Sequence, residues 1–323
     1  MKKALITGIL GQDGFYLAKL LKSKGYKIYG IHETANDKLI SNFSKFYKKA
    51  VFLIECNITD KDKVTDLIKE IKPDECYHLA AKSFVHTKPD ETQEIFEVNI
   101  NGTLYLLNAI LNYAQKCKFY FAATSEMFGS ALETPQNESS VFNPRSPYGI
   151  SKLASYNLVK FYRDHYGIFA ASGILYNHES PRRSDKFVSK KIVRGAINIK
   201  NKKEKKLILG NIHAKRDWGY AEDYVQAMWM MLQYSNPDDF VISTNQLHSV
   251  KEFLEIVFGY FELDWKDFVE FDKKLYREES TLQLRGDYSK AKKVLGWIPK
   301  TDFKKMIEKL IEAELNDISN EKK

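Results

Sequence analysis

The sequence predicts an α/β protein in which a doubly wound parallel sheet is followed by a smaller, mixed α/β C-terminal substrate domain. Short apolar runs alternate with longer stretches of helical periodicity up to about residue 176, a pattern typical of parallel strands joined by right-handed helical crossovers. The first run ends in a glycine-rich turn that opens a helix. The pattern is less regular beyond this part, so we expect a dinucleotide-binding domain over 1–176, with a return segment near 213–247, and a second domain mainly over 177–323.

The composition is that of an ordinary globular protein. A chain of 323 residues, 44% hydrophobic and 28% charged, can bury one large core or two smaller ones. It has no apolar run of about 18 residues, so we expect no membrane span. The net charge is +8, but the lysines are scattered, which favours an anionic small substrate over nucleic acid. The three cysteines lie far apart, which predicts free thiols in the cytoplasm and neither disulfides nor a metal site.

The glycine-rich turn predicts a dinucleotide site of the Rossmann type. An apolar strand over 3–7 precedes it, and a helix that runs to Gly25 follows it. Gly8 permits the tight turn, Gly11 lets the backbone approach a pyrophosphate, and Gly14 lets the helix pack on the strand. The helix N-terminus then offers its N–H groups and positive dipole to phosphates. Gln12 and Asp13 lie inside this turn and belong to the predicted cofactor site.

The ends of the next strands supply further candidate cofactor residues. The second strand, over 27–31, is followed by Glu33 with no arginine beside it, which favours NAD(H) over the alternative NADP(H). The others are Asn57 and Ile58 after the third strand, Ala80 and Ala81 after the fourth, and Asn99 in a helix over about 93–115. We expect Thr59 to cap the helix over 61–71 and His78 to be a core histidine. Ser83 and His86 are candidates for facing a substrate.

The stretch from residue 124 to residue 152 holds the candidate catalytic residues. Tyr148 and Lys152 are four apart, so they share one helix face, and an ammonium beside a phenol favours the phenolate that a general base requires. Glu126 follows a strand over 118–124, with Thr124 and Ser125 just before it. The C-terminal edge of such a strand faces the ligand crevice. The Tyr-x-x-x-Lys spacing alone also occurs by chance, so its value depends on the glycine turn upstream.

Three arginines are candidates for binding a diphosphate, because guanidinium groups match phosphate oxygens in a bidentate way. Arg182 and Arg183 follow a strand over 169–176, and Arg216 opens a stretch over 216–224 that we expect to be a turn into a helix. The alternative is that they form structural salt bridges. The carboxylates available for those are Glu179, Asp217 and Glu222.

Together these motifs resemble the extended short-chain dehydrogenase/reductases, and within them the GDP-mannose 4,6-dehydratase group. The resemblance covers nearly the whole chain. It rests on Thr7-Gly8-Ile-Leu-Gly11-Gln-Asp-Gly14, Thr124-Ser-Glu126, Arg145-Ser-Pro-Tyr148-Gly-Ile-Ser-Lys152, Asn177-His-Glu-Ser-Pro-Arg-Arg183 and Arg216-Asp-Trp-Gly219.

The resemblance implies a redox-neutral hydro-lyase with a tightly bound nicotinamide cofactor. Tyr148 would take the proton of the C4 hydroxyl, and Lys152 would hold the nicotinamide ribose and lower the pKa of Tyr148. Glu126 would remove the C5 proton and protonate the departing C6 hydroxyl, and Thr124 would hydrogen-bond near the C4 oxygen. The implied ligands of the nucleotide diphosphate are Asn177, Arg216 and Arg277.

The resemblance also implies a homodimer or homotetramer. In this family the helix that bears the catalytic tyrosine often packs against a second copy. In this chain Leu153, Leu158 and Val159 would supply apolar surface on that helix.

Three departures from the group bear on cofactor and sugar. The chain has His32-Glu33-Thr34 where the group usually has two arginines suited to NADP, Arg277-Glu-Glu-Ser280 in place of Arg-Pro-Ala-Glu, and Asn57 in place of an aspartate. The chain also resembles the branch that acts on GDP-N-acetylglucosamine in legionaminic acid synthesis. We therefore expect GDP-N-acetylglucosamine slightly ahead of GDP-mannose, with a GDP-heptose enzyme as a further possibility.

Two rival functions stay open from the sequence. A nucleotide-sugar 4-epimerase or C4 dehydrogenase would share Tyr148 and Lys152 but would need no carboxylate for eliminating water. Glu126 directly after Thr124 and Ser125 favours the dehydratase. A more remote rival is a non-catalytic regulator that senses a dinucleotide with the same fold.

Overall fold

Seven parallel strands form the central sheet, which confirms the predicted fold class. In this computed structural model the residues described are 1–323 except 34–36, 48–49, 84–88, 273, 275–282 and 322–323. The strand order is β10-β6-β5-β4-β1-β2-β3, and it reverses direction between β1 and β4, where a doubly wound sheet forms its ligand crevice. The strands are β1 (Lys3–Thr7), β2 (Lys27–His32), β3 (Val51–Glu55), β4 (Glu75–His78), β5 (Lys118–Thr124), β6 (Ala170–Leu175) and β10 (Asp239–Ile242).

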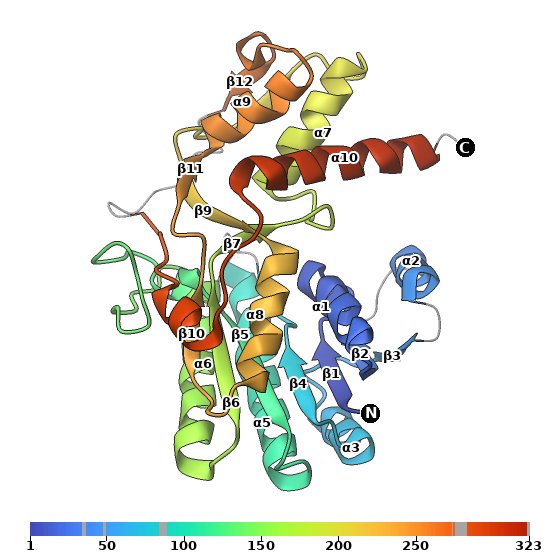
Figure 1. The fold of residues 1–323 in the computed structure, drawn as a ribbon, viewed down its shortest axis with the longest axis vertical. Helices are drawn as coiled ribbons and strands as arrows, with labels where there is room; N and C mark the ends of the chain where they lie inside the picture. The colour runs from blue at the N-terminus through green and yellow to red at the C-terminus, as the bar shows by residue number, and fades with distance from the viewer. Residues whose placement is uncertain (34–36, 48–49, 84–88, 273, 275–282, 322–323) are drawn as a thin grey trace.

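Helices cover both faces of the sheet (Figure 1). One face packs on α1 (Gln12–Ser23) and α8 (Ala221–Gln233), in a core that also takes in residues of α2 (Asp37–Tyr47) and of the π-helix Ala291–Leu295. The other face packs on α3 (Lys61–Ile71), α5 (Gly102–Tyr113) and α6 (Pro147–Tyr166). The strands are buried on both sides by these two cores, as expected for an all-parallel sheet.

A third hydrophobic core lies above the sheet in Figure 1. Its helices are α7 (Val188–Lys200), α9 (Val250–Tyr260) and α10 (Phe303–Glu321), and two small sheets accompany them. One small sheet has the order β11-β9-β7, with β7 (Asn177–Glu179), β9 (Lys215–Tyr220) and β11 (Leu247–Ser249). The other pairs β8 (Leu207–Leu209) with β12 (Val269–Phe271). The boundary between two domains at residue 176 stays a prediction.

Three local expectations were wrong. Residues 215–220 form strand β9, not a turn, because they pair in parallel with β7 and in antiparallel with β11. Asp60, not Thr59, caps α3, since its carboxylate accepts the N–H of Lys63 at 3.0 Å. The predicted helix over 93–115 is divided into α4 (Thr92–Phe96), a π-helical turn (Glu97–Asn101) and α5.

Two expectations about buried polar groups agree with the structure. His78 is a satisfied core histidine, held by Thr7 Oγ1 at 2.8 Å and Thr103 Oγ1 at 3.0 Å. Burial lowers the pKa of His78 to about 3, so its imidazole is neutral. The three cysteines are free and buried. No helix in the part of the chain that the structure describes combines the length and hydrophobicity needed to cross a bilayer.

Gly14 should be intolerant of even a methyl group. A Cβ at this position would lie 2.5 Å from the Ile9 carbonyl oxygen and 2.6 Å from that of Gly8, both backbone atoms that cannot rotate away. We expect Gly14→Ala to lower the free energy of unfolding by about 1–3 kcal/mol, the usual cost of overpacking, as measured by urea denaturation. Gly259→Ala is the matched control, since its Cβ would meet no atom within 4 Å; equal stability of the two variants would contradict the packing argument.

Candidate active site

The glycine turn has the geometry that a dinucleotide site requires. Gly8 has a positive φ of 70°, and a Cβ there would lie 2.9 Å from the backbone of Ala80. The Thr7 hydroxyl accepts the N–H of Ala80 at 3.1 Å and that of Leu79 at 3.2 Å. The turn after β1 and the segment after β4, which carries Ala80 and Ala81, therefore lie against each other. Gly11 is the N-cap of α1, so the helix begins at the crevice without a capping side chain and its first N–H groups can meet phosphates.

Gln12 and Asp13 contact the segment after β6. The Gln12 amide donates to the His178 carbonyl oxygen at 3.0 Å and accepts the Ser180 hydroxyl at 2.8 Å. Asp13 holds His178 Nε2 through both of its oxygens, at 3.0 and 2.9 Å. These side chains connect the predicted cofactor turn with the start of β7, where Asn177 lies. The sequence did not indicate this role for His178, because its partner Asp13 is 165 residues away.

The remaining predicted cofactor residues lie along the carboxyl edge of the sheet. Glu33 follows β2, and its carboxylate is 3.7 Å from Lys82 Nζ, which also pairs with Glu94 at 2.8 Å. Asn57 is exposed after β3 and accepts the N–H of Thr59 at 3.0 Å. Ile58 is buried and packs on Gly102, where an added Cβ would meet it at 2.7 Å.

Asn99 is buried beside the segment that follows β4. Its side-chain Oδ1 accepts the N–H of Lys82 at 2.9 Å, and its side-chain Nδ2 donates to Ser151 Oγ at 2.9 Å and to the Lys82 carbonyl oxygen at 3.2 Å. Thus Asn99 ties the segment after β4 to α6. These contacts engage its amide with protein, so the structure shows it positioning the predicted cofactor segment.

Local signals place Tyr148 at the start of α6. Pro147 begins the helix, and the Ser146 hydroxyl caps it by accepting the N–H of Gly149 at 3.0 Å. A Cβ on Gly149 would lie 2.6 Å from the Glu126 carbonyl oxygen, so its absence lets α6 approach the short 3₁₀ turn Ser125–Met127 closely. The hydroxyl of Thr124 hydrogen-bonds Tyr148 and accepts the N–H of Glu126 at 3.2 Å.

The predicted catalytic residues therefore come together at the carboxyl end of β5. The Thr124 hydroxyl contacts the Tyr148 phenol and the backbone N–H of Glu126, and the negative charge of the Glu126 carboxylate raises the pKa of Tyr148. Ser125, which was also predicted to be catalytic, is buried at the start of the same 3₁₀ turn, and its carbonyl oxygen accepts the N–H of Phe128 at 2.9 Å.

The expectation that Lys152 lowers the pKa of Tyr148 does not hold in this structure. Burial raises the pKa of Tyr148 to about 12, and the carboxylate of Glu126 adds to the rise, while the hydrogen bond from Thr124 and the charge of Arg183 act in the opposite direction. The Lys152 ammonium donates to the Ala122 carbonyl oxygen at 2.8 Å instead. The spacing of four residues correctly predicted that Tyr148 and Lys152 lie on one helix, but it could not predict that burial raises the pKa of Tyr148.

Lys152 is itself strongly perturbed. It is only 2% exposed, its Nζ lies 4.7 Å from the centre of the Phe121 ring, and burial lowers its pKa to about 7. An amine that titrates near neutral pH can change its charge during a reaction at modest cost.

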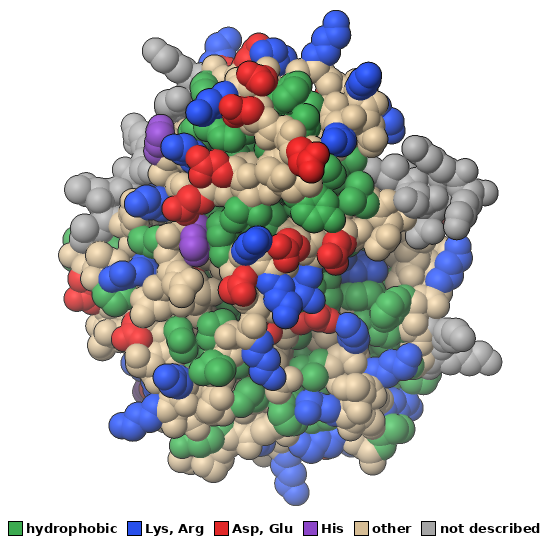
Figure 2. Space-filling model, turned by 45° about the horizontal axis from the view of Figure 1, so that its top comes forward, with side chains coloured by type: hydrophobic (Ala, Val, Ile, Leu, Met, Phe, Trp, Pro, Cys, Tyr) green, Lys and Arg blue, Asp and Glu red, His purple; other side chains and the backbone are tan. Residues whose placement is uncertain are grey.

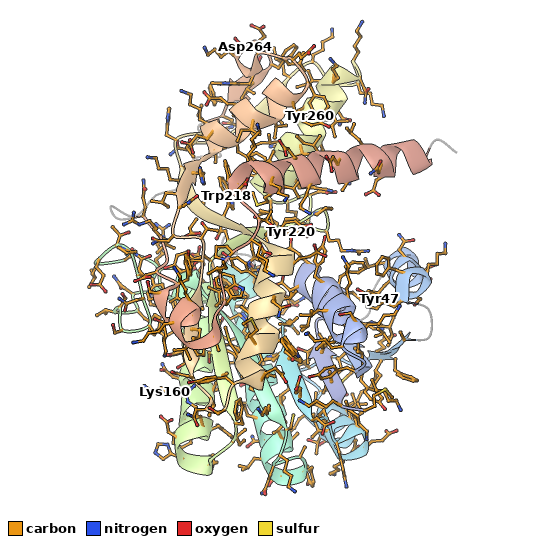
Figure 3. The ribbon with its side chains drawn as sticks, in the orientation of Figure 1. Tyr47, Lys160, Trp218, Tyr220, Tyr260 and Asp264 are labelled. Atoms are coloured by element: carbon orange, nitrogen blue, oxygen red, sulfur yellow. The ribbon has the colours of Figure 1, made fainter. Side chains whose placement is uncertain are left out.

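Lys152 should leave a signature in the pH dependence of stability. Between about pH 7 and about pH 10.4 an unfolded lysine holds a proton that the native one lacks. The free energy of unfolding therefore rises with pH over this window, and we expect Lys152→Met to flatten that rise in urea titrations at a series of pH values. Lys160→Met is the control, since Lys160 is an exposed lysine on the same helix (Figure 3). A slope unchanged by Lys152→Met would contradict the pKa assigned here.

The predicted substrate residues differ in their exposure and in their contacts. Ser83 is exposed at the edge of the crevice, and Asn177 opens β7 opposite Trp218 of β9. Arg216, in β9, is partly buried and donates to the Lys215 carbonyl oxygen at 2.7 Å. Figure 3 shows Trp218 and Tyr220 of this strand between the central sheet and the helices above it. His86 and Arg277 lie outside the described residues.

The two neighbouring arginines are used differently. Arg183 pairs with Glu179 at 3.3 Å, as the alternative interpretation predicted. The Arg182 guanidinium lies over the Phe15 ring, 3.3 Å from its centre, and burial lowers its pKa. That places Arg182 on the side of α1 that faces α2, where Phe15 contacts Tyr47. The other two carboxylates considered for salt bridges pair elsewhere: Asp217 accepts from Thr244, and Glu222 pairs with Lys19.

Charges of both signs are interspersed on the face that Figure 2 shows. Among the described residues, no group of three or more histidine, cysteine, aspartate or glutamate side chains could hold a metal ion. The groups described at this site are the Tyr148 phenol, the Glu126 carboxylate, the Lys152 ammonium and the N-terminus of α1.

Comparisons with known proteins bear on this site. A family model described as GDP-mannose 4,6 dehydratase matches residues 5–310. GDP-mannose 4,6 dehydratase 2 of Arabidopsis thaliana is 43% identical over 332 residues, which cover 99% of this chain and 89% of the relative. Among solved structures, dTDP-glucose 4,6-dehydratase of Bacillus anthracis in complex with NAD aligns with a TM-score of 0.86 at 20% identity, covering 99% of this chain and 98% of that one. RMD of Pseudomonas aeruginosa complexed with NADPH aligns with a TM-score of 0.81 at 21% identity, covering 98% and 100%.

The fold and the side chains at its crevice define an extended short-chain dehydrogenase/reductase. The match to the family model and the identity to the plant relative extend over most of the chain. The chain therefore belongs to the GDP-mannose 4,6-dehydratase family, and it is an enzyme of the hydro-lyase class, as the sequence predicted.

Proposed function

We propose that the protein converts GDP-mannose into GDP-4-keto-6-deoxymannose with the loss of one water. The observation that carries this proposal is the Tyr148–Thr124–Glu126 cluster at the end of β5, in a chain of this family. It places a phenol, a hydroxyl and a carboxylate beside the predicted dinucleotide turn. Oxidation of the C4 hydroxyl requires a base that takes its proton. The elimination of water that follows requires a second group, a carboxylate that can accept one proton and donate another.

Each residue has one role in the proposed mechanism. The phenolate of Tyr148 takes the proton of the C4 hydroxyl, and Thr124 fixes the phenol and the C4 oxygen by hydrogen bonds. A bound nicotinamide dinucleotide supplies the chemistry of accepting the C4 hydride and returning it to C6, so no net oxidation occurs. The C4 ketone acidifies the C5 hydrogen, and Glu126 removes that proton. Glu126 then gives a proton to the C6 hydroxyl, which leaves as water, and Tyr148 protonates C5 at the end.

The residues present fit such a cofactor. Gly8 and Gly14 occupy positions that a Cβ would block, and the N-terminus of α1 opens onto the crevice at Gly11. Lys152 would hold the nicotinamide ribose, and the positive charge of an oxidised nicotinamide nearby would oppose the raised pKa of Tyr148. The cofactor residues proposed from the sequence remain proposals, and the side chains of Asn99 and Asp13, which bind other protein groups, are assigned supporting positions.

We propose NAD(H) ahead of NADP(H) because of Glu33. Its carboxylate can accept ribose hydroxyls but would repel a 2′-phosphate. Lys82 lies 3.7 Å from Glu33, and its positive charge would attract a 2′-phosphate. The preference for NAD(H) therefore requires that Glu33, not Lys82, faces the ribose. We expect NADH to bind more tightly than NADPH in fluorescence titrations, and Glu33→Gln to narrow the difference. Tighter binding of NADPH by the wild-type protein would reverse the assignment.

The sugar is proposed to be mannose. The residues that depart from the group's pattern favoured GDP-N-acetylglucosamine slightly, but the family match, together with a 43% identical relative named for GDP-mannose, favours GDP-mannose instead. The test is a substrate panel of GDP-mannose, GDP-N-acetylglucosamine and GDP-heptose, with product masses read by mass spectrometry. Loss of one water from GDP-mannose alone supports the proposal, and loss from another sugar instead would overturn it.

The rival functions are less well supported. A 4-epimerase or C4 dehydrogenase would leave Glu126 without a chemical task, and a regulator would not need the Tyr148 cluster. Assembly as a homodimer or homotetramer through α6 stays a proposal, to be tested by sedimentation. Val159 cannot contribute to that surface, because its side chain is fully buried in the core, whereas Ile150 and Phe161 on the same helix are exposed.

A further inference from the structure

We propose that His178 is a positioning residue that neutralises Asp13 beneath the dinucleotide diphosphate, and so permits a carboxylate in the first turn of the phosphate-binding helix. Asp13 lies in the first turn of α1, the end of the helix that offers its N–H groups to phosphates. An unpaired carboxylate there would repel a diphosphate, because like charges at short range disfavour each other. This inference rests on the proposed dinucleotide site.

The geometry assigns a positive charge to His178. Its Nδ1 lies 2.8 Å from the Tyr176 carbonyl oxygen, and its Nε2 lies 2.9 and 3.0 Å from the two oxygens of Asp13. The carbonyl oxygen can only accept, and Asp13 can only accept when it is ionised, the state that its lowered pKa favours. Both ring nitrogens of His178 then donate, and a histidine that donates from both nitrogens is an imidazolium. Asp13 also accepts from the Gln12 amide at 3.3 Å, which is consistent with an ionised carboxyl group.

The surroundings make this pair strong and specific. The side chains of His178 and Asp13 are 10% and 21% exposed, and the imidazole stacks on Tyr224 with ring centres 4.6 Å apart. Burial by itself lowers the pKa of His178 and raises that of Asp13, but the mutual attraction overrides burial in both cases, so the pKa of His178 is raised and that of Asp13 is lowered. The charge of Arg183 also acts on both groups, but Arg183 lies 3.3 Å from Glu179 and so has its own counter-ion.

The pair also couples the two halves of the site. Through Gln12 and Asp13, the glycine turn holds the backbone and side chain of His178, the residue directly after Asn177. A purely structural role and a charge-neutralising role for the pair make different predictions. If the pair only holds α1 against β7, any substitution that breaks it should weaken NADH binding. A charge-neutralising role predicts that removing the cation alone is harmful, and that removing the anion as well reverses the harm.

The test is a cycle of His178→Gln, Asp13→Asn and the double variant, with NADH affinity measured by fluorescence and melting temperature by circular dichroism. We expect His178→Gln to raise the Kd for NADH roughly tenfold, the scale of one nearby uncompensated like charge. We expect Asp13→Asn to bind NADH at least as tightly as the wild-type protein. The double variant should recover most of the affinity that His178→Gln loses, even though it also lacks the pair.

The controls separate this inference from the proposed function. Asp62→Asn removes an exposed acid from the first turn of another helix, α3, and His213→Gln removes an exposed histidine; both should leave NADH affinity unchanged. If the double variant binds NADH as weakly as His178→Gln, or if His178→Gln binds as tightly as the wild type, the inference is wrong while the proposed function stands. If the wild-type protein binds neither NADH nor NADPH, the proposed cofactor site itself fails, and the inference with it.

Discussion

Replacing Tyr148 with phenylalanine should lower kcat for GDP-mannose by about 10²–10⁴-fold, the usual contribution of a general acid–base group. The hydroxyl is the only atom removed, and the ring that packs at the start of α6 remains. Thr124 keeps its contact with the N–H of Glu126 at 3.2 Å, so the local fold should persist. Turnover is measured by the appearance of the 4-keto product. The Kd for GDP, measured by calorimetry, should stay within about twofold of the wild-type value, because binding of the nucleotide does not depend on the catalytic base.

The matched control for that variant lies on the same helix. Tyr166 ends α6 and is exposed, so Tyr166→Phe removes the same atom far from the crevice and should keep wild-type kcat. If Tyr148→Phe retained a third or more of wild-type turnover, the phenol would not be the base, and a different group would have to accept the C4 proton.

Replacing Glu126 with glutamine should stop the reaction after its first step. An amide has the same shape as the carboxylate but cannot take the C5 proton or deliver one to the C6 hydroxyl. We expect kcat for dehydration to fall by about 10²–10⁴-fold, while oxidation at C4 still proceeds. Mixing the variant with GDP-mannose should therefore build up the absorbance of reduced nicotinamide, which we expect the wild-type protein to show only transiently.

This partial reaction separates a dehydratase from its rivals. Glu133 is an exposed carboxylate in the loop that follows Glu126, and Glu133→Gln should behave as wild type. A Glu126→Gln protein that still released the dehydrated product at the wild-type rate would remove the carboxylate from the mechanism. Loss of both dehydration and C4 oxidation would show that Glu126 serves the first step as well, contrary to the roles assigned here.

The parts of the fold that could be predicted are those set by local sequence. The start of α6 at Pro147, with Ser146 as its cap, and the strand–turn–helix around Gly8, Gly11 and Gly14 follow from signals a few residues apart. The alternation of strands and helices then fixes a parallel sheet. Strand β9 was missed because it depends on pairing with β7 and β11, which are distant in sequence.

The candidate site was predictable in its residues but not in its electrostatics. Thr124 ends β5, Glu126 lies in the 3₁₀ turn that follows it, and Tyr148 lies in the first turn of α6. The three residues therefore meet at the carboxyl edge of the sheet, where folds of this kind place their ligands. The rise in the pKa of Tyr148 depends on burial, and burial is a property of the packed structure. The Asp13–His178 pair joins α1 to the start of β7, so no local pattern could show it.

A hydrogen isotope followed through the reaction would show directly whether the C4 hydride returns to C6. GDP-mannose carrying deuterium at C4 would be incubated with the protein, and the product examined by NMR and mass spectrometry. If the hydride removed from C4 returns to C6 within one catalytic cycle, as we propose, the deuterium is retained and appears at C6 of the 4-keto-6-deoxy product. Loss of the label to free nicotinamide, or its return to C4, would contradict the account and identify a dehydrogenase or an epimerase.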